Sequence, residues 1–313
     1  MTQNSLAAPA EIGPALPAGS VLGGFAALVG AALAMSVSPT FVRLADVGPF
    51  ASAFWRVALA LPVLWAWMRR ADAGVAVPVS ARFSWPIVLA GLSFTGDLLF
   101  WHSAVMRTTV ANATFFATLA PLWVVIFGWL LFRDRVGRSV LWGLGICLVG
   151  GSVLVVQSLT FAPAHVVGDG LGMVTGMFFG LYFLAVRSAR GTASAARVTF
   201  EQSIVTAAVL LGVALVLEPG ILPHSGRGWL VLLALALVSH VGGQGLLALA
   251  LGRLPAAFSS LVIFLESISA ALVAWAVLGE AVAPIQALGG LAIVAGIWVA
   301  RPRADRPAPA VPA

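Results

Sequence analysis

Residues 118–134 read TLAPLWVVIFGWLLFRD, and residues 264–280 read FLESISAALVAWAVLGE. The two stretches superpose without a gap when the chain is shifted by 146 residues. The same register pairs Ser93 with Ser239, Gly96 with Gly242, Arg107 with Arg253, Trp129 with Trp275, Asp134 with Glu280, Gly143 with Gly289 and Gly150 with Gly296. Because tryptophan, arginine and acidic residues coincide in one register, we interpret the chain as two copies of one unit.

Apolar stretches of about 20 residues, the length that crosses a bilayer as a helix, recur along the whole chain. They lie near residues 21–42, 49–68, 85–106, 110–132, 139–157, 170–188, 198–217, 229–251, 256–278 and 283–300. Charged residues, glycine or proline separate neighbouring stretches. The pattern predicts an all-α integral membrane protein with ten transmembrane helices.

Each half of the chain holds five of these helices. Since five is odd, the second half enters the membrane from the side opposite to the first, which is the inverted repeat found in many transporters. The sequence therefore predicts two inverted five-helix repeats, at residues 21–157 and 158–300. The Pro/Ala-rich residues 1–20 and the polar residues 301–313 are predicted to be disordered tails.

All 17 basic residues are arginines, and they are distributed unevenly across the predicted membrane. One side holds Arg69, Arg70, Arg82, Arg133, Arg135, Arg138, Arg187, Arg190, Arg197, Arg253, Arg301, Arg303 and Arg306. The other side holds only Arg43, Arg107 and Arg227, and Arg56 lies within a span. Because positive charge near helix ends stays on the cytoplasmic side, we expect a multi-pass bacterial inner-membrane protein with both termini in the cytoplasm.

The composition excludes several classes of function. The chain is 61% hydrophobic and only 9% charged, whereas soluble domains are about 25% charged. The net charge of +6 lies at helix ends, so we attribute it to topology and lipid headgroups and expect no nucleic-acid partner. Cysteine occurs once, no Cys/His metal spacing or cofactor motif is present, and the four histidines have no catalytic spacing. We therefore expect neither a metal nor a cofactor, and a protein that is not an enzyme.

The repeated stretches carry a family resemblance. Each is followed by a helix with glycines seven residues apart, and together they resemble the drug/metabolite transporter superfamily, specifically its EamA-like ten-helix exporters. The resemblance covers roughly residues 21–300. It implies export of amino acids and other small metabolites through a central cavity lined by the first four helices of each half. Ser267 stands where the family often has a proline, so no proline is available to break the ninth helix there.

Three ionic residues lie well inside predicted spans, away from the helix ends, where charge is costly and usually faces protein or a water-filled cavity. Asp97 and Glu266 lie near the middle of the third and ninth helices, and Arg56 lies in the outer third of the second. We expect the carboxylates to bind a substrate amine or a coupling proton and Arg56 to bind a carboxylate. The alternative is structural pairing among themselves. Glu201, near a helix end, is expected to pair with Arg197 or another interfacial arginine.

Further candidates for the cavity wall are polar or aromatic. His240 and Gln244 form an i, i+4 pair in the eighth helix, and His102 and Trp101 follow Asp97 on the third. Phe94 and Tyr182 belong to an aromatic group on the third, fourth and sixth helices that suits an apolar or aromatic substrate side chain. The alternative for these residues is ordinary helix packing.

Together the residues predict a secondary transporter that exports small metabolites, most of all amino acids, by alternating access around a midplane cavity. Efflux of lipophilic organic cations through the buried carboxylates is the alternative. A membrane enzyme, a channel and a lipid scramblase are less consistent with the pattern. The glycine pairs of the fifth and tenth helices predict either mutual packing of these helices or a subunit contact in a homodimer.

Overall fold

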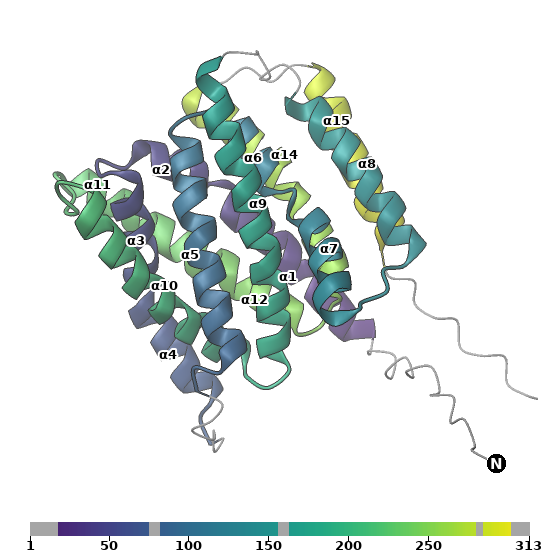
Figure 1. The fold of residues 1–313 in the computed structure, drawn as a ribbon, viewed down its shortest axis with the longest axis horizontal. Helices are drawn as coiled ribbons and strands as arrows, with labels where there is room; N and C mark the ends of the chain where they lie inside the picture. Colours follow the sequence, from purple (N-terminus) through teal and green to yellow (C-terminus); the bar gives the residue numbers. More distant parts are fainter. Residues whose placement is uncertain (1–17, 75–81, 156–162, 280–283, 302–313) are drawn as a thin grey trace, which may run out of the picture.

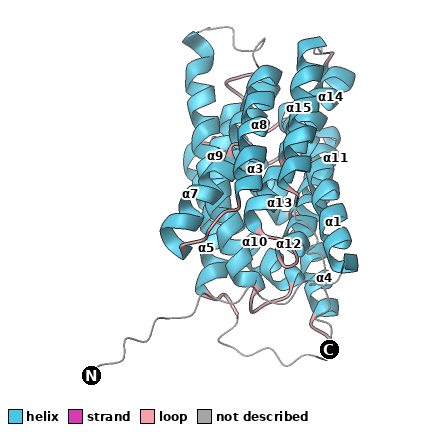
Figure 2. Cartoon of the chain, turned by 90° about the vertical axis from the view of Figure 1, so that its right-hand side faces the viewer, coloured by secondary structure: helices cyan, strands magenta, loops and turns pink. Residues whose placement is uncertain are grey.

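The computed structural model describes residues 18–74, 82–155, 163–279 and 284–301. Every regular element in these ranges is helical (Figure 2). Eight helices there are long and apolar enough to cross a membrane. Two shorter apolar helices, Arg138–Val153 and Pro284–Ala300, stand at the predicted fifth and tenth positions. The predicted all-α membrane class is confirmed, and eight of the ten predicted spans have full membrane-crossing length.

The first half contains α1 (Ala18–Ser36), α2 (Ser38–Leu44), α3 (Pro49–Ala58), α4 (Leu61–Ala71), α5 (Trp85–Val105), α6 (Val110–Ala117), α7 (Ala120–Phe132) and α8 (Arg138–Val155). The second half contains α9 (Pro163–Arg190), α10 (Ala195–Leu217), α11 (Gly226–Ala234), the π-helical segment η2 (Leu235–Gln244), α12 (Gly245–Leu251), α13 (Ala256–Val262), α14 (Phe264–Leu278) and α15 (Pro284–Ala300). The sixth predicted helix thus begins earlier than expected, at Pro163. The predictions for residues 1–17 and 302–313 lie outside the described residues.

Four spans are each divided into two consecutive helices, giving the pairs α1/α2, α3/α4, α6/α7 and α13/α14. In three of them a proline stands in the first turn after the interruption, at Pro39, Pro62 and Pro121. Proline fits a first helical turn but cannot donate a hydrogen bond to the preceding one. The ninth span is interrupted at Ile263 although it lacks a proline there. Its first α14 turn is tightened by a 2.8 Å hydrogen bond from the Glu266 amide to the Ile263 carbonyl.

Helices α8 and α15 pack against each other in a reciprocal manner (Figure 1, where they lie together at one edge of the bundle). A Cβ atom on Gly143 would lie 2.5 Å from the Gly296 carbonyl oxygen, and one on Gly150 would lie 2.7 Å from the Gly289 carbonyl oxygen. Because Gly143 corresponds to Gly289 and Gly150 to Gly296, the two contacts are repeat-mates of each other. Such reciprocity is the property of an isologous contact, here between two halves of one chain.

Cys147 marks the centre of this contact. Its thiol bonds the carbonyl oxygen of Ile293 at 3.5 Å, and Ile293 is the residue that corresponds to Cys147 in the second half. A residue that meets its own repeat-mate lies at the local two-fold axis. The glycine pairs therefore pack the fifth helix against the tenth, which was the first of the two predicted roles.

The remaining helix contacts follow the same symmetry. Helix α5 packs along α9, which Figure 1 shows side by side, and the equivalent segments η2 and α12 pack along α1. Helix α10 packs against α3 and α4, and α14 against α6. The third span of each half thus packs on the first span of the other half. The space between the halves is consequently lined by both.

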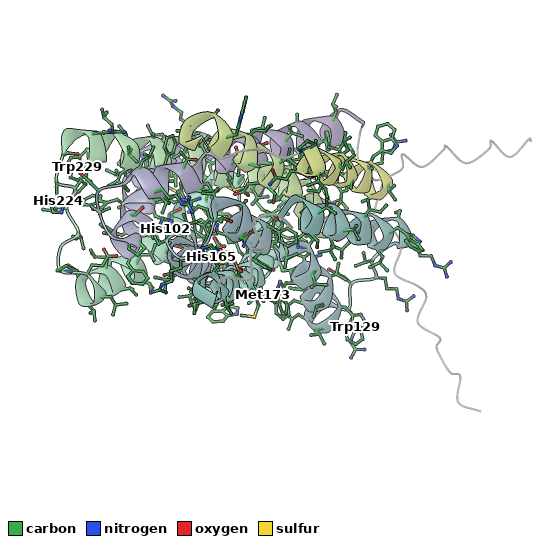
Figure 3. All side chains as sticks on the ribbon, turned by 90° about the horizontal axis from the view of Figure 1, so that it is seen from above. His102, Trp129, His165, Met173, His224 and Trp229 are labelled. Atoms are coloured by element: carbon green, nitrogen blue, oxygen red, sulfur yellow. The ribbon has the colours of Figure 1, made fainter. Side chains whose placement is uncertain are left out.

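The outer surface is strongly apolar. Trp129 and its repeat-mate Trp275 are 65% and 56% exposed, and Trp129 projects at the periphery of the view in Figure 3. Trp142 and Trp298 are similarly exposed. Large exposed apolar side chains on helices of this length are typical of a lipid-facing surface.

Candidate functional site

The interrupted spans meet around one central cavity. Its polar and charged lining consists of Ser38, Arg56, Asp97, Thr118, Gln244 and Glu266. Its remaining lining consists of Met35, Trp101, Ala117 and Phe179. Ser38 begins α2, Ala117 ends α6, Thr118 follows it, and Glu266 lies in the first turn of α14. The backbone at the α1/α2 and α13/α14 breaks keeps right-handed helical angles, so the cavity lies there where the hydrogen-bond pattern of the spans changes rather than where the chain unwinds.

The cavity is small in this conformation. Its volume is about 30 Å³, and one water molecule needs roughly 10–15 Å³ on this measure. An amino acid is far larger than two waters. The described conformation therefore leaves too little room for a substrate of that size, which requires the surrounding helices to separate.

Three charged side chains converge in the cavity wall without direct pairing. Arg56, Asp97 and Glu266 are 4%, 8% and 8% exposed. Both carboxylates are close enough to Arg56 for an electrostatic interaction, yet among the described residues no nitrogen–oxygen contact within 4.0 Å joins them to it. The guanidinium carbon instead lies 5.9 Å from the ring centre of Phe94 and 5.7 Å from that of Trp101. Cation–π contacts of this kind hold an arginine while leaving its N–H donors available.

Several polar atoms of the wall have no hydrogen-bond partner within the described part of the chain. They are Ser38 Oγ, Arg56 Nε and Gln244 Oε1, and all three residues are at least nine-tenths buried. Gln244 donates through Nε2 only to the sulfur of Met35, at 3.4 Å. Buried polar groups in folded proteins are nearly always paired. A group of unpaired polar atoms around one cavity is what a site for a polar ligand is expected to show.

A second layer of side chains lies behind the cavity wall. The ring of Phe94 lies 5.0 Å from Tyr182 and 5.4 Å from His240. The Tyr182 hydroxyl accepts a 2.9 Å hydrogen bond from Gln202, and His240 Nε2 shares a 2.8 Å hydrogen bond with Ser203. These contacts fix the face of Phe94 on which the Arg56 guanidinium rests.

The predicted site residues thus divide into two groups. Arg56, Asp97, Trp101, Gln244 and Glu266 line the cavity. Phe94, His102, Tyr182 and His240 are fully buried but do not line it. His102 packs its ring 5.2 Å from Trp101. Figure 3 shows His224 at one end of the molecule, away from His102 and His165.

Five lining residues were not among the predicted site residues: Met35, Ser38, Ala117, Thr118 and Phe179. The first four lie at helix interruptions, and Pro39 and Pro121 were the available signals for two of these. Thr118 also joins the halves, because its hydroxyl shares a 2.8 Å hydrogen bond with that of Ser267. Phe179 carried no signal that separates it from the other aromatic residues of its helix.

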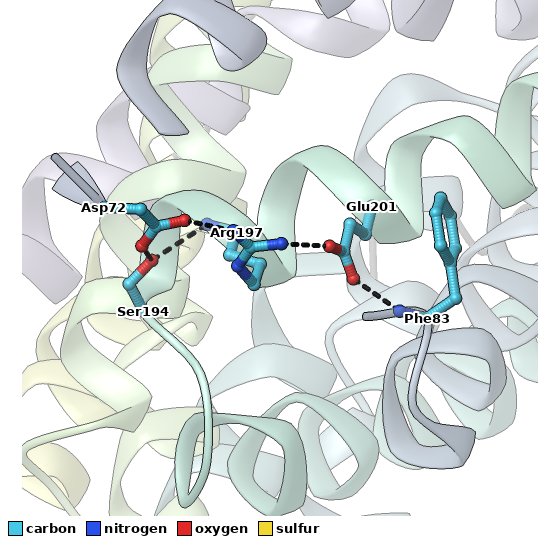
Figure 4. Close-up of polar contacts among 5 residues, drawn as sticks. All are labelled: Asp72, Phe83, Ser194, Arg197 and Glu201. Carbon is cyan, nitrogen blue, oxygen red and sulfur yellow. Dashed lines mark hydrogen bonds and ion pairs between the residues drawn. The ribbon is translucent and has the colours of Figure 1, made fainter. Parts of the chain in front are cut away.

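One end of the α4–α10 pair is held by an ionic group that we name the Asp72 cluster: Asp72, Phe83, Ser194, Arg197 and Glu201 (Figure 4). Arg197 contacts Asp72 at 2.7 Å and Glu201 at 2.6 Å. Ser194 donates to Asp72 at 3.0 Å, and the Phe83 amide donates to Glu201 at 2.7 Å. The predicted pairing of Glu201 with Arg197 is confirmed. The cluster ties the end of α4 and the start of α5 to the first turns of α10.

The other end of α10, where it meets α3, is held by what we name the Glu218 cluster: Phe50, Ala51, Trp55, Glu218 and Ile221. Glu218 accepts hydrogen bonds from the amides of Phe50 and Ala51 at 2.7 and 3.0 Å. The Trp55 indole donates to the Ile221 carbonyl at 2.6 Å. Glu218 is the repeat-mate of Asp72, and Trp55 is that of Glu201. Equivalent positions thus hold the two ends of α10 against the α3/α4 span.

Comparison with known proteins agrees with this architecture. The model of the EamA-like transporter family matches twice, at residues 22–156 and 166–301. The curated proteins named pseudopaline exporter CntI, from Pseudomonas aeruginosa strains UCBPP-PA14 and PAO1, are each 25% identical to this chain over 190 residues. That alignment covers 60% of this chain and 64% of each relative.

A solved structure, titled only as the crystal structure of a protein, superposes with a TM-score of 0.72. The superposition covers 90% of this chain and 96% of the other at 23% identity, so it shows the shared fold. The two family matches fall on the two halves that the sequence register and the reciprocal α8–α15 contact define. The chain belongs to the EamA-like transporter family.

Proposed function

We propose that this small-molecule transporter exports zwitterionic metabolites, amino acids foremost, by alternating access around the central cavity. The single observation that carries the proposal is the convergence of Arg56, Asp97 and Glu266 in one cavity without direct pairing. Arg56 offers a planar fork for a carboxylate, and either acid offers a partner for an ammonium group. A zwitterion satisfies both kinds of group at once.

The remaining wall fits the same class of substrate. Trp101 and Phe179 supply apolar surface for a side chain, while Ser38 and Gln244 supply unpaired polar atoms. Sites for small molecules are mostly apolar with a few placed polar groups. The relatives named as pseudopaline exporters support outward transport of a small metabolite. The choice of amino acids rests on the cavity chemistry and on the family resemblance.

The small volume of the cavity suggests how transport proceeds. The interruptions of α1/α2, α6/α7 and α13/α14 lie at the site, and the repeats 21–157 and 158–300 are the units that would rock against each other. We infer that both termini are cytoplasmic and that the protein resides in the bacterial inner membrane, in keeping with the arginine distribution. Reporter fusions at the two ends test this orientation, and a periplasmic signal from either end contradicts it.

Efflux of organic cations is the second candidate. The cavity holds two carboxylates but one guanidinium, and Trp101 and Phe179 present aromatic faces that attract cations. A cation cannot bind the positively charged Arg56, whereas the carboxylate of a zwitterion can. The two candidates therefore differ in what removal of Arg56 does.

The test is counterflow in proteoliposomes, with substrates first found by thermal stabilisation of the purified protein against amino acids and organic cations. Asp97→Asn and Glu266→Gln are each expected to lower transport about tenfold or more, because a hydrogen bond to a charged group contributes about 1.5–3 kcal/mol. Arg56→Gln lowers transport similarly if the substrate is a zwitterion. Undiminished or faster cation transport by Arg56→Gln favours the second candidate, and wild-type rates in both acid variants contradict both.

Ser152→Ala serves as the matched control in these assays. Ser152 bonds only the carbonyl of Leu148 one turn earlier, on the exposed side of α8. Its removal takes a polar group from the membrane region without touching the cavity. A loss of transport in this control equal to that of the acid variants would attribute their effect to general instability.

A further inference from the structure

A second, larger cavity lies at the arginine-rich end of the molecule and is not used by the proposed transport site. Its volume is about 540 Å³, within the range of roughly 300–1,000 Å³ typical of ligand pockets. It lies between α7, α8, α9, α13 and α15, so that both halves contribute to it.

The charges around this cavity are unbalanced. The charged lining of the cavity contains one acid, Asp134, and three arginines, Arg135, Arg187 and Arg301. Arg187 already holds Asp134 through both of its terminal nitrogens, at 2.5 and 3.3 Å. Arg135 is exposed and has no ionic partner among the described residues. The guanidinium of Arg301 lies over the indole of Trp298, 3.5 Å from its centre. Two positive charges therefore remain for an anion.

The amino end of α8 adds to the positive field. Helix α8 begins at Arg138, and Gly137 and Ser139 line the cavity. The amides of Val140 and Leu141 bond back to the Gly137 carbonyl, and the earlier amides of the turn lie at the positive end of the helix dipole. Helix amino ends and arginines are the two groups that proteins most often use to hold phosphate.

The rest of the lining is apolar and leads into the membrane region. Val124, Val140 and Phe258 form part of the wall. Trp298, which supports Arg301, is a residue type that gathers at the headgroup level. A basic rim above apolar walls matches a molecule with a phosphate head and a hydrocarbon tail better than it matches free phosphate.

The arginines of this cavity are not repeated in the other half of the sequence. The residues that correspond to Arg135, Arg187 and Arg301 in the other half are Ala281, Phe41 and Val155. The basic cavity is therefore a departure from the repeat symmetry. It belongs to the end that the arginine distribution assigns to the cytoplasmic leaflet, where basic pockets between helices bind anionic headgroups.

We propose that this cavity binds the phosphate headgroup of an anionic phospholipid through Arg135, Arg301 and the amino end of α8. Because the lining comes from both halves, the bound lipid bridges the two repeats. The proposal is independent of the transported substrate.

The test is lipid binding to the purified full-length protein in detergent, measured by native mass spectrometry and by thermal stabilisation. Dioleoylphosphatidylglycerol is compared with dioleoylphosphatidylcholine, which has the same acyl chains, and inorganic phosphate is added as a competitor. We expect preferential binding of phosphatidylglycerol that excess phosphate does not displace. The double variant Arg135→Gln/Arg301→Gln is expected to weaken that binding about tenfold or more.

The matched control is Arg69→Gln/Arg70→Gln, which removes the same charge from exposed positions at the same end but outside the cavity. It is expected to leave phosphatidylglycerol binding within about twofold, since screening confines a charge's influence to about 10 Å. Equal weakening by both double variants would mean general surface attraction and overturn the proposal. Equal binding of the two lipids overturns it as well. Displacement by inorganic phosphate overturns the assignment to a lipid and leaves a site for soluble phosphate.

Discussion

The Asp72 cluster and the Glu218 cluster hold opposite ends of α10 against the α3/α4 span from equivalent positions, yet they use different chemistry. At one end Arg197 lies between two acids and is 7% exposed, with Glu201 at 3%. At the other end Glu218 meets backbone amides at the start of α3 and needs no cation. The first arrangement depends on one cation shared by two acids, whereas in the second a single carboxylate accepts hydrogen bonds from two amides of a helix terminus.

The difference shows what the repeat conserves. Asp72 follows the last turn of α4 and reaches the first turn of α10, whereas Glu218 follows the last turn of α10 and reaches the first turn of α3. The position and the acidic group are therefore the same in both halves. What they bind is not kept, since Ala51 stands where the other half has Arg197. In an alternating-access cycle the two ends open in turn. Under the proposed alternating-access mechanism, the unequal clusters predict unequal free-energy costs for the two openings.

The largest effect is expected from Arg197→Ala. This change leaves the buried Glu201 and the partly buried Asp72 without their cation, and breaking a buried pair costs about 3–5 kcal/mol. Thermal unfolding of the purified protein measures the loss. Arg69→Ala, at an exposed arginine of the same end, is the control.

The neutral triple variant Asp72→Asn/Arg197→Gln/Glu201→Gln separates charge from packing. It is expected to recover much of the stability lost in Arg197→Ala, because it leaves no unpaired charge behind. An Arg197→Ala protein as stable as Arg69→Ala would show that the Asp72 cluster contributes little, and the contrast between the two ends would disappear.

A smaller effect is expected from Glu218→Gln. The amide keeps one oxygen acceptor for the Phe50 and Ala51 amides but loses the negative charge, and a hydrogen bond to a charged group contributes about 1.5–3 kcal/mol. The loss should be milder than that of Arg197→Ala in the same unfolding measurement. Glu218→Asp, which keeps the charge, is the control.

Cysteine labelling sharpens this second prediction. The one native cysteine, Cys147, is fully buried, so a cysteine placed at Ala117 reports on the cavity. Glu218→Gln is expected to speed the modification of this introduced cysteine by an impermeant reagent added from the Glu218 side of the membrane. Arg197→Ala is expected to speed the modification when the reagent is added from the opposite side. Faster labelling from the same side in both variants would contradict a separate role for each cluster.

The smallest effect is expected from Trp55→Phe. The ring contact with Trp229, at 4.9 Å between centres, is largely retained, while the hydrogen bond to Ile221 is lost. A single neutral hydrogen bond contributes about 0.5–1.5 kcal/mol. Glu201→Ala at the equivalent position removes a charged partner of Arg197 and should cost more. The reverse order in thermal unfolding would refute the inequality of the two ends.

Much of the fold followed from local composition. Apolar runs located the helices, and the 146-residue register predicted which glycines are equivalent, which the α8–α15 contact then confirmed in its reciprocity. The position of Glu201 near a helix end predicted a pairing with Arg197 or another interfacial arginine, and Arg197 is the partner. The interruption at Ile263 did not, because no proline marks it.

The candidate site was predicted in part. Asp97, Glu266 and Arg56 stood out because charge is rare within spans, and all three line one cavity. His240 and Tyr182 were equally conspicuous, yet they lie a layer deeper, bonded to Ser203 and Gln202. Sequence spacing gives the face of a helix on which a residue lies but not the depth at which a neighbouring helix covers it.

The sequence by itself determined that this chain is a helical membrane protein of two related halves, because apolar length, arginine placement and the repeat register are properties of residues in order. Tertiary structure alone decided that Asp72 lies beside Ser194, that Thr118 bonds Ser267, and that Arg56 rests on Phe94 rather than on an acid. These contacts join residues 38 to 149 positions apart. Their distances depend on how helices from two inverted halves interlock, and no local propensity encodes that arrangement.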